Sequence, residues 1–162
     1  MNSYQQNNYP LEPFGIRDIR ITNVVISLPT LAEKLRLKEI DVHPSNAVDY
    51  PWGVEKMSRL IEAILLKIPL PVFYFDVSNP IFWYSIDGIQ RLRTIKSFME
   101  NGFLLQNMEI LTHLNNINYF NLENSYKRIL YDTQIITYQI EAQTPLELRE
   151  LIFKKIRDMN EN

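Results

Sequence analysis

A short apolar run that breaks at Asp87-Gly88 and continues with helical spacing constrains the fold most. Residues 83–86 have the composition of a strand, and glycine at position 88 suits a tight turn. Apolar residues then recur at the spacing of one helix face: Leu92, Ile95, Phe98 and Met99. The stretch therefore predicts a strand, a tight turn and a helix that ends near Asn101-Gly102, with Gly102 in the left-handed conformation.

The polar residues of this stretch are not expected to pack in the hydrophobic core. Asp87, Gln90, Arg91 and Thr94 fall at the turn and in the first two helical turns. Free backbone N–H groups and the positive end of the helix dipole favour an anion there, so a phosphate site is one interpretation. Asp87 as N-cap with Gln90 three residues later is also a capping box, and residue chemistry leaves both interpretations open.

The rest of the chain predicts both helices and strands. Residues 1–14 are rich in Asn, Gln, Tyr and Pro and predict a flexible tail, which leaves 15–162 as a single domain. Strands are predicted at 19–26, 39–42, 72–75, 81–86 and 135–140, with a loop at 43–51. Further helices are predicted from a Thr30–Glu33 capping box, over 54–68 with Glu62 on the solvent face, over 125–131, and from 145 to 159.

Composition excludes several classes of site. The chain of 162 residues has 17 basic and 19 acidic residues, no cysteine and two distant histidines, so a thiolate or histidine-cluster metal site is not expected. Four glycines are too few and too scattered for a dinucleotide fingerprint or a Walker loop. Asp76 and Asp87 flank a predicted hairpin and should lie near its opposite ends. We find no signal peptide or membrane span and expect a cytoplasmic protein without membrane association.

The segment Ile86-Asp-Gly-Ile-Gln-Arg-Leu-Arg-Thr-Ile95 resembles the Asp-Gly-Gln-Gln-Arg-Leu-Thr-Thr-Ile signature of a large bacterial and phage family. That family includes the N-terminal domains of GmrSD-type modification-dependent restriction enzymes and is similar in fold to ParB and sulfiredoxin. Trp52 with the helix after it, Pro69-Leu-Pro71 and the C-terminal strand and helix extend the resemblance to about residues 38–160. It implies an α+β fold, a small mixed sheet packed by helices in a single domain.

The resemblance also implies a nucleotide-phosphate site and NTP hydrolysis coupled to DNA restriction or phage sensing. Asp87, Gln90 and Arg91 would be catalytic, and Gly88, Arg91 and Thr94 would bind an NTP (ATP, GTP or CTP), with Mg²⁺ as its companion ion. No protein metal site is implied. The expected partners are the nucleotide, DNA, and a nuclease subunit or other protein.

The departures from the signature keep an alternative open. Ile89 replaces the first glutamine, Arg93 replaces a threonine, and Asn46-Ala47-Val48 stands where the family has Tyr-Gln-Arg. A second phosphate-facing arginine is thus missing, and no His-Asn-His nuclease segment follows within the sequence. The alternative is a non-catalytic DNA-associated or protein-interaction module, phage-encoded or not, that keeps the fold without hydrolysis. A stand-alone nuclease would need a divalent metal on Asp87 with a second carboxylate.

Overall fold

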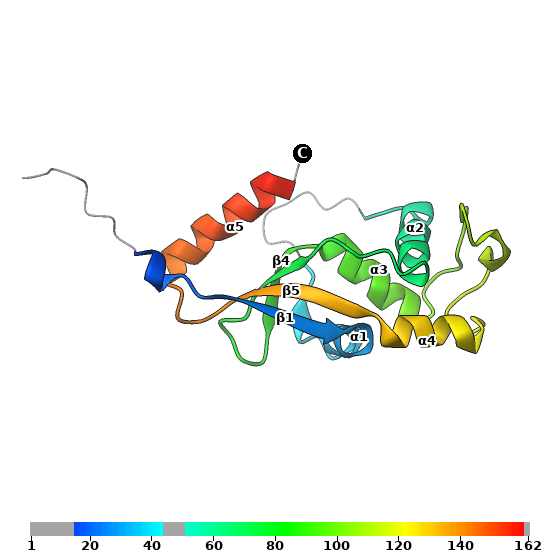
Figure 1. Ribbon diagram of the computed structural model, residues 1–162, viewed down its shortest axis with the longest axis horizontal. Helices are drawn as coiled ribbons and strands as arrows, with labels where there is room; N and C mark the ends of the chain where they lie inside the picture. The colour runs from blue at the N-terminus through cyan, green and yellow to red at the C-terminus, as the bar shows by residue number, and fades with distance from the viewer. Residues whose placement is uncertain (1–14, 44–50, 161–162) are drawn as a thin grey trace, which may run out of the picture.

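The computed structural model describes residues 15–43 and 51–160, and confirms the predicted α+β class (Figure 1). The strands are β1 (Ile21–Ser27), β2 (Ile40–Asp41), β3 (Phe73–Asp76), β4 (Trp83–Asp87) and β5 (Gln134–Ile140). The helices are α1 (Leu28–Arg36), α2 (Val54–Leu65), α3 (Ile89–Met99), α4 (Asn124–Asp132) and α5 (Leu146–Asn160). The predicted tail over 1–14 and most of the predicted loop over 43–51 lie outside the described residues.

The strands form one mixed sheet in the order β1-β5-β3-β4-β2. The β3–β4 hairpin is antiparallel as predicted, and β1 pairs antiparallel with β5. Two parallel pairs join distant parts of the chain, β3 with β5 and β2 with β4. β3 therefore lies at the centre of the sheet, although only four residues long.

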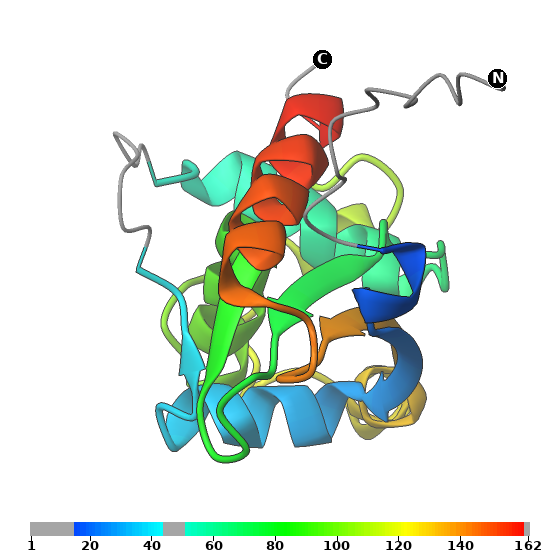
Figure 2. The ribbon, with the colours of Figure 1, turned by 90° about the vertical axis from the view of Figure 1, so that its left-hand side faces the viewer.

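Helices cover the two faces of the sheet unequally. α1 to α4 pack on one another and bury the main core against one face, where alternate strand residues such as Phe73, Phe75 and Ile135 point. α5 lies on the opposite face, in front of the strands in Figure 2. It contacts β4 and closes a small second cluster with Ile86 and Ile140. None of the helices in the described ranges has the length and apolarity needed to cross a bilayer.

The start of α1 differs from the prediction. Ser27 is the N-cap and its hydroxyl accepts the Thr30 N–H at 3.2 Å, so the helix begins at Leu28 rather than after Thr30. Pro29 in the first turn explains the earlier start, because proline is well tolerated where helical N–H groups have no partner. Glu33, the predicted capping glutamate, instead pairs with Arg36 at 2.6 Å.

The ends of two helices also differ. Asn101, not Gly102, takes the left-handed conformation after α3, with φ of 65°. Gly102 is needed for a different reason, because a Cβ there would lie 2.5 Å from Ser97 Oγ. α2 ends at Leu65, short of the predicted Ile68, and Lys67 there has φ of 59°.

The prediction that Glu62 lies on the solvent face of α2 is wrong. Its side chain is buried, and its carboxylate accepts the backbone N–H groups of Glu109, Ile110 and Leu111 at 3.1, 2.7 and 2.7 Å. Burial raises the pKa of Glu62, but the three backbone hydrogen bonds outweigh this and hold the pKa below its usual value. Glu62 thus orders the irregular segment that follows α3.

Replacing Glu62 with Gln should lower the free energy of unfolding at pH 7 by about 1–3 kcal/mol, because a neutral amide accepts these N–H groups less well. A group whose folded pKa is depressed stabilises above its unfolded value and loses that contribution as the pH falls through the folded pKa. The difference between wild type and E62Q should therefore be constant above about pH 5 and shrink below the ordinary value of 4.5.

Urea unfolding followed by circular dichroism from pH 7 to pH 3 measures both effects. The matched control is Glu109→Gln, whose exposed side chain should contribute no more than about 0.5 kcal/mol. Equal stabilities for wild type and E62Q at pH 7 would contradict the assignment.

Candidate functional site

The candidate site is the corner where β4 ends and α3 begins. β4 ends at Asp87, and Gly88 is the N-cap of α3 with φ of 92°. The prediction that Asp87 caps the helix is wrong, since Gly88 occupies that position and offers no side-chain oxygen to the first N–H groups. The sequence predicted the strand, turn and helix correctly, but shifted the cap by one residue.

The Arg91 guanidinium lies inside this corner. Its side chain is 11% exposed, and its Cζ lies 4.2 Å from the centre of the Phe73 ring, on which the guanidinium stacks. Nη1 donates to the carbonyl of Pro71, and Nη2 donates at 3.2 Å both to Val72 O and to Asp87 Oδ2. We refer to these contacts of Arg91 with Pro71, Val72, Phe73 and Asp87 as the Arg91 clasp. It fixes the start of α3 against the segment that leads into β3.

Burial lowers the pKa of Arg91, and the Asp87 carboxylate opposes this effect. Arginine has so high a pKa that the group stays cationic at neutral pH. Of its five N–H donors, three are engaged in the Arg91 clasp, and the remaining two have no hydrogen-bond partner among the described residues. The corner thus holds a fixed guanidinium cation with two N–H donors that no described residue accepts from.

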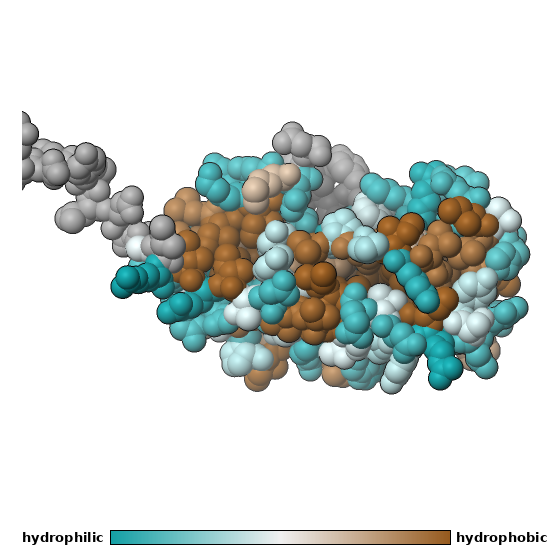
Figure 3. Space-filling view, viewed as in Figure 1, coloured by the Kyte–Doolittle hydropathy of each residue, from teal (hydrophilic) through white to brown (hydrophobic). Residues whose placement is uncertain are grey.

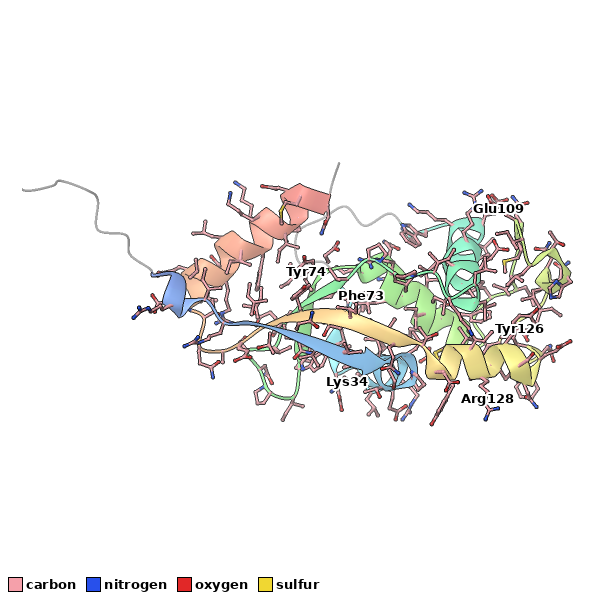
Figure 4. All side chains as sticks on the ribbon, in the orientation of Figure 1. Lys34, Phe73, Tyr74, Glu109, Tyr126 and Arg128 are labelled. Carbon is pink, nitrogen blue, oxygen red and sulfur yellow. The ribbon has the colours of Figure 1, made fainter. Side chains whose placement is uncertain are left out.

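Gly88 makes the Arg91 clasp possible. A Cβ at this position would lie 2.6 Å from Phe73 Cδ1 and 3.0 Å from Arg91 Nη2. The positive φ adds a second reason for glycine, because other residues are strained there. In Figure 4, Phe73 is labelled near α3 and Tyr74 nearer α5, as expected for successive residues of a strand.

The other predicted site residues face different neighbours. Gln90 Oε1 accepts the backbone N–H of Trp52 at 3.2 Å, which brings the residue before the N-cap of α2 to the first turn of α3. Thr94 is buried, and its hydroxyl donates to Gln90 O at 2.8 Å. Arg93 donates to Val42 O at 2.6 Å, at the other end of the segment between β2 and α2. Asn46-Ala47-Val48, at the place of the family's Tyr-Gln-Arg, lies outside the described residues.

The two aspartates of the hairpin lie at its opposite ends, as predicted. Asp87 pairs in register with Tyr74, and Asp76 with Tyr84. Asp76 is bound by Arg149 of α5, with Nη1 to Oδ2 at 3.1 Å. The described residues contain no group of three or more His, Asp or Glu side chains placed to hold a metal ion.

Sequence reasoning missed Phe73 and the carbonyls of Pro71 and Val72 as parts of the site. It assigned this segment only to a strand and the approach to it. The partners of Arg91 lie about 20 residues earlier in the chain, and no local pattern links the two segments. The one available signal was Gly88, an isolated glycine before a helix, because a glycine there often indicates that another part of the chain packs closely against the backbone.

Substituting Gly88 with Ala should lower the free energy of unfolding by about 2–4 kcal/mol, because the methyl group meets Phe73 and the left-handed backbone is strained. Chemical denaturation of wild type and variant measures the loss. Gly53→Ala is the matched control, since Gly53 is also a helix N-cap but has φ of −66°, and a Cβ added there would meet nothing within 4 Å. It should change stability by no more than about 1 kcal/mol. A G88A variant as stable as G53A would rule out the close packing.

Comparison with known families gives a match that includes this corner. The family model for the N-terminal domain of the GmrSD restriction endonuclease matches residues 49–162, which include β3, β4, α3 and the whole corner. Searches of curated proteins and of solved structures gave no match, so the likeness to ParB and sulfiredoxin stays a prediction. Because the match spans most of the sequence and the signature segment, the chain belongs to the family of GmrSD restriction endonuclease N-terminal domains.

Proposed function

We propose that this domain binds the phosphates of an NTP at the first turn of α3 and hydrolyses it on behalf of a DNA restriction or phage-defence system. Membership of the GmrSD family supports the restriction-related role. The observation that carries the nucleotide site is the corner itself. It combines a helix N-terminus without a side-chain cap and a fixed guanidinium with two donors outside the Arg91 clasp.

The proposed contacts follow from the chemistry of each group. The α3 N-terminus and the remaining Arg91 donors would bind phosphate oxygens, and Gly88, with its positive φ, would allow the tight turn that places them beside each other. Asp87 and Gln90 would orient the attacking water, each from a side chain already fixed by a neighbour. Thr94 would contribute by holding Gln90 O, because its own hydroxyl is buried. Mg²⁺ would arrive with the nucleotide, since the described residues contain no metal cluster of their own.

A second candidate function is a non-catalytic module that contacts DNA or a nuclease subunit. The observation that favours it is the Arg91 clasp, which gives Arg91, Asp87 and Gly88 a structural purpose without any ligand. The buried Thr94 hydroxyl is accounted for in the same way.

Isothermal titration of ATP, GTP and CTP, with and without Mg²⁺, distinguishes the two. Wild type should bind at least one of them, and Arg91→Ala should weaken binding at least tenfold, since a charge-assisted contact to phosphate is lost. The matched control is Arg149→Ala. Arg149 is about as buried, at 14% exposed, and pairs with the aspartate at the other end of the same hairpin.

R149A should bind within about threefold of wild type, with both variants shown to be folded by circular dichroism. Absence of heat from wild type with all three nucleotides would refute the proposal in favour of the non-catalytic module. Equal losses in R91A and R149A would mean that Arg91 acts only through stability.

A further inference from the structure

β1 is an edge strand of the sheet. It is the first strand in the sheet order, and within the part of the chain that the structure describes it pairs only with β5. Glu141 N donates to Arg20 O, and Leu28 N donates to Thr133 O, both at 2.9 Å, at the two ends of this ladder. In an antiparallel ladder the hydrogen-bonded positions alternate, so the even-numbered residues of β1 face β5. Ile21, Asn23 and Val25 therefore direct their N–H and C=O groups outward.

None of these outward groups has a partner among the described residues. The side chains of Ile21 and Val25 are also 43% and 55% exposed. Edge strands are usually protected by a charged residue, a proline or a bulge, and β1 has none of them: its sequence is Ile-Thr-Asn-Val-Val-Ile-Ser in an unbroken register. The opposite edge, β2, has only two residues and offers little to pair with.

We propose that β1 pairs antiparallel with β1 of a second copy of this chain, about a twofold axis at Asn23. The sequence of β1 supports its own copy as the occupant. With Asn23 opposite Asn23 of the second copy, Ile21 faces Val25 across the axis in both halves. This register places the Asn23 side chains opposite each other and the apolar side chains opposite apolar ones, with no two charges opposed. The outward N–H and C=O groups of Ile21, Asn23 and Val25 in the two copies then form six backbone hydrogen bonds.

The surface around β1 fits this arrangement. Ile136 of β5 is in register with Val25 and 44% exposed, but it lies one strand inward from the edge and outside the proposed contact. Figure 3 shows apolar side chains along the middle of the molecule, over β1 and β5. Pairing joins the two sheets into one of ten strands and shields Ile21 and Val25 without reaching the β4–α3 corner, so it is independent of nucleotide binding.

Amide hydrogen exchange by NMR tests the pairing directly. The contact is one strand wide, so association should be weak, and exchange is compared at about 1 mM and about 20 µM. At both concentrations the amides of Thr22, Val24 and Ile26 should exchange slowly, because they bond to β5. Those of Ile21, Asn23 and Val25 should exchange freely in the dilute sample and at least fivefold more slowly in the concentrated one.

Sedimentation equilibrium on variants identifies the surface. Asn23→Lys places two cations opposite each other at the axis and should raise the dimer dissociation constant at least tenfold. Ile136→Lys is the matched control, because it adds the same charge on the same face one strand inward, and it should dimerise as wild type does. A wild type that stays monomeric at 1 mM overturns the proposal. A dimer that persists in N23K also overturns it. If that dimer is lost in I136K instead, the two copies pack through the sheet face and not through the β1 edge.

Discussion

The stacking of the Arg91 guanidinium on Phe73 is the interaction on which the centre of this fold depends. A cation this buried needs hydrogen-bond partners, and here two carbonyls and the Asp87 carboxylate accept from three of its five N–H donors. These partners belong to the segment before β3 and to the end of β4. One side chain thus joins both strands of the central hairpin to the helix that follows it, and Gly88 supplies the space in which they meet.

Other polar side chains of the helices act in a similar way on irregular backbone. Gln90 accepts from Trp52, Arg93 donates to Val42 O, and Glu62 accepts three N–H groups from residues 109–111. Backbone groups outside helices and strands lose water on folding and need such partners. In a chain whose central strand is four residues long, these contacts define where the loops run as much as the apolar core does.

Local patterns in the sequence predicted most elements because their causes are local. Apolar spacing located α2, and the break at Asp87-Gly88 located the corner between β4 and α3. The misplaced Glu62 has a non-local cause, because its donors belong to a segment more than 40 residues away. The helix cap was misplaced for a local reason, since the turn occurs at Gly88 and Arg91, four residues after Asp87, binds the Asp87 carboxylate. The parallel pairing of β3 with β5 also leaves no local trace.

The Arg91 clasp changes what the family signature means in this chain. Asp87, Gly88 and Arg91 all have a structural purpose, so their presence would be required even in a domain that binds no nucleotide. The two Arg91 donors outside the clasp are different, because no group in residues 15–43 and 51–160 accepts from them. A guanidinium fixed on an aromatic ring has already lost its conformational freedom, so a phosphate that reaches those donors binds without the entropic cost of ordering the side chain. Under the proposed function, the same contacts that hold the corner together would preorganise it for an anion.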